Sequence, residues 1–147
     1  MKATIVYHSK KGKTASYARN IALYLWQQGV DVRLSSIGDC KEEWFADTDL
    51  WVLGCWTSGY ILFGQKPSRL WRGFVQEHRD TIGRHHIILF ATYLFHPGSM
   101  FYSMQKSLGL GKKEHLSHIA SRNGRLQEAD RRVLKHALDL NFETFHH

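Results

Sequence analysis

A short loop near the start of the chain carries the residues best suited to chemistry. It lies between an apolar run at residues 3–7 and a helical pattern that begins near Ala15, and it consists of Ser9, Lys10, Lys11, Gly12, Lys13 and Thr14. Where a strand turns through such a loop into a helix, several backbone N–H groups point at one spot, and the helix dipole favours negative charge there. The loop therefore predicts a phosphate site.

This loop does not fit the P-loop of nucleoside triphosphatases. That motif needs a Gly five positions before the Gly of its Gly-Lys pair, and Tyr7 stands there. The remaining pattern of hydroxyl, Gly and hydroxyl residues resembles the phosphate loop of the flavodoxin family, Thr/Ser-x-Thr-Gly-x-Thr, which wraps the phosphate of FMN. Ser9, Gly12 and Thr14 match it, whereas Lys11 replaces the second hydroxyl residue. The resemblance implies FMN as the cofactor.

The segments that follow alternate between strand and helix patterns. Unbroken apolar runs predict strands at 3–7, 50–55 and 87–91, and mixed patterns predict strands at 30–35 and 116–121. Helical spacing predicts apolar faces made of Ala18, Ile21, Ala22, Leu25 and Trp26, of Leu70, Trp71, Phe74 and Val75 after Pro67 at the first helical position, of Met100, Met104 and Leu108, and of Leu126, Ala129, Val133, Ala137 and Leu140. A short helical turn is expected at 42–45.

This alternation predicts an α/β fold in three layers, a doubly wound five-stranded parallel sheet with helices on both faces. Strands buried on both faces are unbroken apolar runs, whereas edge strands contain polar residues. The second and fifth strands are mixed and so become the edges, which gives the flavodoxin-like order 2-1-3-4-5. We expect a single domain at residues 1–145 and treat His146 and His147 as a candidate tag remnant.

Ligands in such sheets bind beside the point where the strand order reverses, at the carboxyl ends of the strands. Two further loops meet there, and they contribute Trp56, Thr57, Ser58, Gly59 and Tyr60, and Thr92, Tyr93, Phe95 and His96. The family resemblance implies that these loops hold the isoalloxazine ring, with Trp56 or Tyr60 on one side and Tyr93 on the other. It also implies that the Gly59 carbonyl accepts a hydrogen bond from N5 of the reduced flavin.

The charge balance predicts anionic partners. Twenty Lys and Arg against thirteen Asp and Glu give a net charge of +7. Typical flavodoxins are acidic and dock on basic reductase surfaces, whereas this chain is basic. Its partner is therefore expected to have an acidic docking face, or its substrate to be anionic. The basic residues lack the interleaved aromatic platform of single-strand binders, so no nucleic acid is expected.

Other function classes receive little support from the composition. No apolar run approaches the roughly 20 residues that span a bilayer, and Met1 precedes a strand pattern instead of a signal peptide, so a cytoplasmic protein without a membrane span is expected. Cys40 and Cys55 are expected to be reduced thiols. The ten histidines form no recognised ligand pattern, and no metal site is predicted.

The leading hypothesis is an FMN-binding electron-transfer protein that delivers electrons to a partner reductase, because no Ser-His-Asp set or acid-base pair is seen and no catalytic residue is predicted. One alternative is a small FMN-dependent oxidoreductase that acts directly on an anionic ring compound or quinone, similar to protoporphyrinogen dehydrogenases, with Phe63, Phe95 and His96 facing the substrate. Another is a flavin-free interaction module whose contact patch contains Trp56, Tyr60, Phe63 and Phe95.

Overall fold

The sheet has five parallel strands in the order β2-β1-β3-β4-β5, as predicted. The structure is a computed structural model that describes residues 1–58, 64–110 and 116–146, with side chains as far as Asn141. The strands are β1 (Lys2–His8), β2 (Asp31–Ser36), β3 (Leu50–Trp56), β4 (His86–Thr92) and β5 (Ser117–Ser121). β2 and β5 form the two edges, so the mixed polar patterns of these strands identified them correctly.

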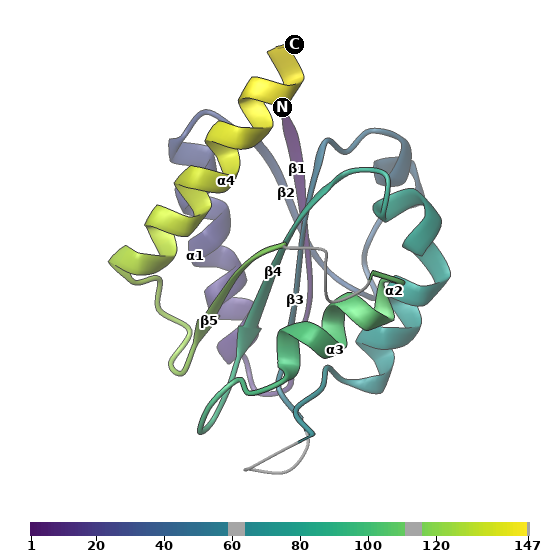
Figure 1. The fold of residues 1–147 in the computed structure, drawn as a ribbon, viewed down its shortest axis with the longest axis vertical. Coiled ribbons are helices and arrows are strands. Elements are labelled where there is room, and N and C mark those ends of the chain that lie inside the picture. The colour runs from purple at the N-terminus through teal and green to yellow at the C-terminus, as the bar shows by residue number, and fades with distance from the viewer. Residues whose placement is uncertain (59–63, 111–115, 147) are drawn as a thin grey trace.

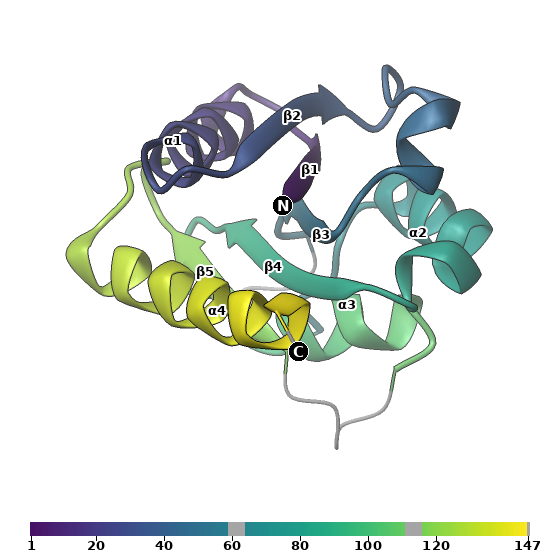
Figure 2. The same cartoon turned by 90° about the horizontal axis from the view of Figure 1, so that it is seen from above.

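Helices cover both faces of the sheet and give the predicted three layers (Figure 1, Figure 2). They are α1 (Lys13–Gln27), α2 (Arg69–Ile82), α3 (Met100–Ser107) and α4 (Glu128–His146), with a 3-10 helix, η1, at Glu42–Ala46. α1 and α4 pack on one face, and α2 and α3 pack on the other. Within the described ranges, every helix lacks the combination of length and apolar character that a bilayer span needs.

The central strands supply apolar side chains to both cores. In β3, Leu50 and Val52 pack beneath α1 and α4, whereas Trp51 and Leu53 pack beneath α2 and α3. Successive side chains of a strand point to opposite faces, so an unbroken apolar run serves both layers at once. The two cores fix the sheet and leave the loops at the carboxyl ends of β1, β3 and β4 beside one another.

The predicted apolar faces of three helices were wrong in part. Trp26 is 66% exposed, Leu70 is 64% exposed and Leu140 is 49% exposed, whereas Tyr17 is buried. Among the side chains of α4 that the structure describes, the buried ones are Asp130, Leu134, Ala137, Leu138 and Asn141. The Tyr17 hydroxyl donates a hydrogen bond to the Asp130 carboxylate at 3.0 Å, so a polar residue occupies the buried face. Because the buried Asp130 belongs to the packed face of α4, that face differs from the predicted apolar face.

The start of α2 also differs from the prediction. Ser68 is the N-cap, and its hydroxyl accepts a hydrogen bond from the Trp71 N–H at 3.3 Å. Pro67 therefore lies just before the helix and not at its first position. The capping hydroxyl of Ser68 satisfies an N–H group that would otherwise have no partner in the first turn.

Candidate functional site

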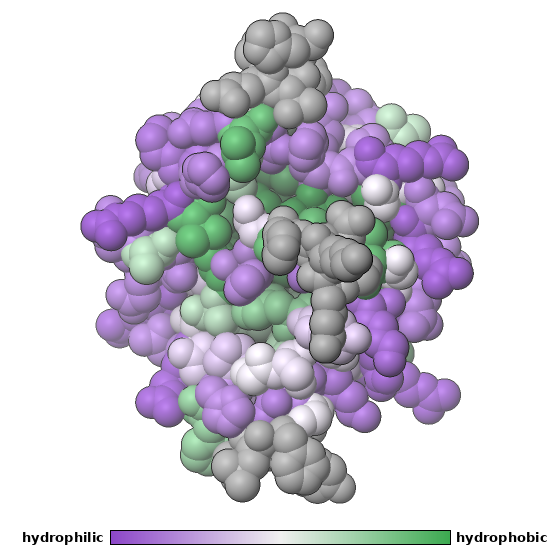
Figure 3. Space-filling view, viewed as in Figure 1, coloured by the Kyte–Doolittle hydropathy of each residue, from purple (hydrophilic) through white to green (hydrophobic). Residues whose placement is uncertain are grey.

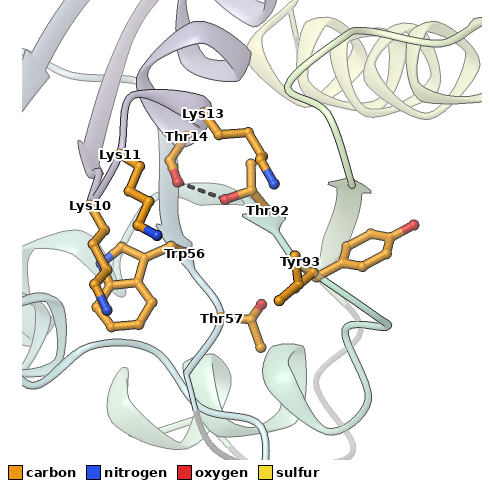
Figure 4. A pocket seen from close by; sticks show the side chains of 9 residues that line it. Lys10, Lys11, Lys13, Thr14, Trp56, Thr57, Thr92 and Tyr93 are labelled. Atoms are coloured by element: carbon orange, nitrogen blue, oxygen red, sulfur yellow. Dashed lines mark hydrogen bonds between the residues drawn. The ribbon is translucent and has the colours of Figure 1, made fainter. Parts of the chain in front are cut away.

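A cleft of about 220 Å³ opens where β1, β3 and β4 end (Figure 4). Its lining consists of Lys10, Lys11, Lys13, Thr14, Trp56, Thr57, Thr92, Tyr93 and Leu94. In the sheet, β1 has β2 as its neighbour on one side and β3 on the other, so the strand order reverses at β1. The cleft lies at this reversal. Residues from all three loops selected from the sequence meet here.

Gly12 gives the first loop its shape. Its φ is +92°, a left-handed conformation in which other L-residues are strained. The Ser9 hydroxyl accepts hydrogen bonds from the N–H groups of Gly12 at 3.1 Å and Ala15 at 3.3 Å. Ser9 therefore braces the loop against the first turn of α1, and its own proton remains available for a ligand oxygen.

The same loop presents backbone donors that the described protein atoms leave unused. Across the described part of the chain, the N–H groups of Lys10, Lys11, Lys13 and Thr14 donate no hydrogen bond. The first turn of α1 contains no acidic residue. Unpaired N–H groups at a helix start beside three lysines have the chemistry of an anion site, and this chemistry fits a phosphate group.

A hydroxyl pair joins the first loop to the end of β4. Thr14 Oγ1 lies 2.7 Å from Thr92 Oγ1, and both side chains are buried (Figure 4). The Thr92 carbonyl also accepts a hydrogen bond from the Thr57 N–H at 2.9 Å. Thr92 thus contacts the loops that follow β1 and β3, and it fixes their separation.

Trp56 and Tyr93 flank the cleft from opposite sides (Figure 4). The Lys10 ammonium lies 4.9 Å from the centre of the Trp56 ring, within cation–π distance. Trp56 Nε1 and Thr57 Oγ1 are buried and have no hydrogen-bond partner among the described residues. Such unpaired polar atoms cost about 1–3 kcal/mol each when nothing satisfies them. The unpaired Thr57 hydroxyl at the cleft suits a polar ligand.

The predicted residues differ in how directly they belong to the cleft. Ser58 does not line it, and its N–H and carbonyl pair with the backbone of Lys66 at 2.9 and 3.0 Å. Phe95 and His96 are exposed residues of the loop that follows β4, and they do not line it either. The predictions for Gly59, Tyr60 and Phe63 fall outside the described residues.

Two residues near the cleft were missed in the sequence. Leu94 lines the cleft with 68% of its surface exposed. His8, the last residue of β1, has Nδ1 2.6 Å from the Ser68 hydroxyl, and its ring centre lies 6.4 Å from that of Trp56. Burial lowers the pKa of His8. The available signals were an apolar residue directly after Tyr93 and a polar ring directly before the phosphate loop.

The thiols and carboxylates give no sign of other chemistry. Burial raises the pKa of Cys55, and it raises that of Cys40 to about 11, so both free thiols are protonated at neutral pH. Among the residues whose placement is described, no three His, Cys, Asp or Glu side chains gather as metal ligands. The lining of the cleft, with its lysines, hydroxyls and aromatic rings, has the chemistry that suits an anionic, partly aromatic ligand.

The arrangement of strands, helices and cleft defines a flavodoxin fold. No family model matches the chain, and no curated protein matches it in sequence. Among solved structures, an archaeal flavodoxin aligns with a TM-score of 0.65 and 18% identity over 97% of this chain and 98% of its own. The two-electron reduced flavodoxin of Megasphaera elsdenii aligns with a TM-score of 0.67 and 19% identity over 92% of this chain and 96% of its own.

The same fold is found within a longer chain. Rubredoxin oxygen:oxidoreductase of Desulfovibrio gigas aligns with a TM-score of 0.68 and 16% identity over 94% of this chain but 34% of its own. These likenesses establish the fold alone, because structures of such low identity can share an architecture while their sites differ.

Proposed function

We propose that this chain binds FMN in the cleft and transfers electrons to a partner protein. The observation that carries the proposal is the set of four unpaired N–H groups, from Lys10, Lys11, Lys13 and Thr14, beside three lysines at the reversal of strand order. Bound flavin would supply the redox chemistry, while the protein supplies binding, orientation and access.

The residues of the cleft divide between the two ends of the ligand. The Ser9–Thr14 loop would hold the phosphate, and Trp56 and Tyr93 would flank the ring. Thr57 Oγ1, which is buried without a partner among the described residues, would donate to or accept from a polar ligand atom. The roles of Gly59 and Tyr60 at the ring side follow from the family resemblance and belong to the same proposal. Thr92 lines the cleft and is included, whereas Ser58, Phe95 and His96 lie outside the lining and receive no contact with the ring.

Electron transfer between proteins is favoured over direct catalysis. The chain aligns over nearly the full length of the small flavodoxins, whereas it matches only 34% of the rubredoxin oxygen:oxidoreductase chain. The described cleft also contains no Ser-His-Asp set or paired acid and base. We infer a partner reductase with an acidic docking face, because this chain has a net charge of +7. We also propose that the protein is cytoplasmic.

A comparison of FMN with riboflavin tests the phosphate site. The two ligands share the ring, but riboflavin lacks the phosphate. Each hydrogen bond to a charged group contributes about 1.5–3 kcal/mol, so FMN should bind at least about tenfold more tightly than riboflavin. Quenching of flavin fluorescence gives both dissociation constants. Equal affinities would show that the loop does not bind the phosphate. In a separate assay, turnover of a quinone without a second protein would favour the direct oxidoreductase.

The three lysines of the cleft provide a second test. In the variant with Lys10, Lys11 and Lys13 all changed to Gln, the affinity for FMN should fall and should depend less on salt, because fewer charges attract the phosphate. Changing Lys106 and Lys135 to Gln is the control, since both side chains are exposed on helices away from the cleft. If both variants keep the salt dependence of the unmodified chain, these lysines do not contact the phosphate.

A further inference from the structure

The loops around the cleft carry charges of one sign. The four loops at residues 9–14, 57–68, 93–99 and 122–127 contain no Asp or Glu, and their Lys and Arg residues are Lys10, Lys11, Lys13, Lys66, Arg122 and Arg125. All thirteen carboxylate residues of the chain lie elsewhere in the sequence. The remaining loop at this edge, which follows β2, has one residue of each sign, Asp39 and Lys41. We call the six Lys and Arg residues of the other four loops the basic collar.

The contacts place five of the six collar residues at or next to the cleft, and Arg125 follows three residues after Arg122 in the same loop. Lys10, Lys11 and Lys13 line the cleft directly. Arg122 Nε donates a hydrogen bond to the carbonyl of Leu94, a lining residue, at 3.1 Å. The backbone of Lys66 pairs with that of Ser58, the residue after Thr57. The collar therefore has members on the loops that follow β1, β3 and β5.

No carboxylate neutralises these cations within the described structure. The ion pairs found there join other residues, such as Lys2 with Asp47 and Arg131 with Glu128. The side chains of Lys66, Arg122 and Arg125 are exposed. An unpaired cluster of one sign attracts an oppositely charged surface over several ångströms and steers it toward the cleft.

Exposed apolar side chains lie at the same edge. Leu94 is 68% exposed and Phe95 is 52% exposed, and both belong to the loop after β4. In Figure 3 the lower end of the molecule, where the strands end, shows a small apolar group beside hydrophilic side chains. A few apolar residues inside a charged rim match the general anatomy of a protein docking surface.

We propose that the basic collar with Leu94 and Phe95 is the docking surface for an acidic protein, which meets the chain through carboxylates arranged around an apolar pocket. The proposal rests on the proposed function, because it places the electron-transfer partner over the cleft. Single-stranded nucleic acid fits less well, since such ligands bind platforms of several stacked aromatic rings and Phe95 is the exposed aromatic residue of the described collar loops.

Charge reversal on the collar tests the location. The probe is a 20-residue peptide of Glu with Leu at every fourth position, titrated into the full chain with and without saturating FMN. The double variant Lys66→Glu and Arg125→Glu should bind it at least about tenfold more weakly, because four units of charge change beside the proposed contact. The matched control, Arg84→Glu and Lys135→Glu, changes the net charge equally at exposed positions outside the collar and should lose less than about threefold.

The apolar part of the surface has its own variant. Leu94→Ser should weaken binding of the Leu-containing peptide but leave binding of a poly-Glu peptide of the same length unchanged, because only the first peptide can bury an apolar side chain. Amide chemical shifts should move at residues 9–14, 93–98 and 122–125 when either peptide binds. Shifts confined to other surfaces would overturn the proposal.

Two further outcomes would also overturn it. Equal weakening by the collar and control variants would show a general effect of net charge. Tighter binding of a 20-nucleotide oligo-dT or of phosphatidylserine vesicles than of the peptide, with the same loss in the collar variant, would assign the surface to nucleic acid or membrane. Because the peptide is also titrated without FMN, a failure of flavin binding contradicts the proposed function and is seen separately from a failure of docking.

Discussion

Gly12 is the residue whose backbone most directly shapes the loop at residues 9–14, the proposed phosphate site. Its φ is +92°, and a Cβ added there would meet nothing within 4 Å. Gly12→Ala should therefore cost about 1–2 kcal/mol in stability through backbone strain alone, and relaxation of the loop should weaken FMN binding. Urea unfolding and flavin fluorescence measure the two effects.

Gly29 is a matched control for this prediction. Its φ is +86°, it is equally open, and it lies after the end of α1. Gly29→Ala should lose similar stability but keep its FMN affinity. If both variants bind FMN as the unmodified chain does, the shape of the Gly12 loop has no part in binding.

His8 should make the stability of the protein depend on pH. Burial lowers its pKa below the ordinary value of 6.5, so the unfolded chain takes up a proton first as the pH falls. The free energy of unfolding should be highest above pH 6.5 and should decrease as the pH falls from 6.5 toward the folded-state pKa. His8→Asn, which keeps a hydrogen-bonding group beside Ser68, should show a shallower decrease. Identical pH profiles in urea unfolding would show that His8 does not contribute.

At the scale of elements, Gly54 allows β3 and β4 to pack beneath α1. Gly54 pairs with Phe90 in the sheet, and an added Cβ would lie 2.1 Å from the Phe90 ring. Phe90 itself packs edge-on against Tyr17, with the ring centres 5.9 Å apart, so it has little room to move. Gly54→Ala should destabilise the fold by about 1–3 kcal/mol through overpacking.

Gly73 offers the opposite expectation for the same substitution. It lies on the exposed side of α2, where an added Cβ meets nothing within 4 Å. Gly73→Ala should raise stability by up to about 1 kcal/mol through helix propensity. Thermal unfolding of the two variants should therefore shift in opposite directions, and a stabilised Gly54→Ala variant would contradict the described packing of Phe90.

The Tyr17–Asp130 hydrogen bond joins α1 to α4. Both residues are buried, and Asp130 Oδ2 accepts from the Tyr17 hydroxyl and from the Gln127 N–H at 3.0 Å each. Tyr17→Phe should cost about 1–3 kcal/mol, because the buried carboxylate loses a donor. Tyr24→Phe removes an exposed bond of 3.3 Å to Arg131 and should change stability by less than about 0.5 kcal/mol. Equal unfolding midpoints for the two variants would contradict this.

The sequence was informative about elements whose burial depends on their own residue pattern. Unbroken apolar runs such as Leu50 to Cys55 predicted the central strands, and the polar residues of 30–35 predicted an edge. The face of α4 could not be predicted in this way, because Asp130 is buried by a contact with Tyr17, which lies 113 residues away in the chain. A periodicity argument cannot include such a partner.

The same division applies to the cleft. The loop at residues 10–14 could be predicted from the local sequence, because its strand, loop and helix follow one another in the chain. Leu94 and His8 were missed, since their positions depend on the packing of β4 and on the Ser68 hydroxyl. Residue type alone does not reveal such tertiary contacts.

At the scale of the whole molecule, the fold brings three loops to one edge but does not determine what binds there. A flavodoxin fold can hold a cofactor for a partner, belong to a larger enzyme or serve as an interaction surface. In this chain the unpaired N–H groups, the three cleft lysines and the collar all favour an anionic ligand at that edge. The account therefore depends on whether FMN occupies the cleft.

Calorimetric titration of FMN into the flavin-free protein tests this central claim most directly, with thermal unfolding measured on the same samples. The account predicts one site per chain and a stabilisation of about 2.7 kcal/mol when free FMN reaches one hundred times its dissociation constant. An absence of binding heat together with an unfolding temperature that FMN leaves unchanged would contradict it.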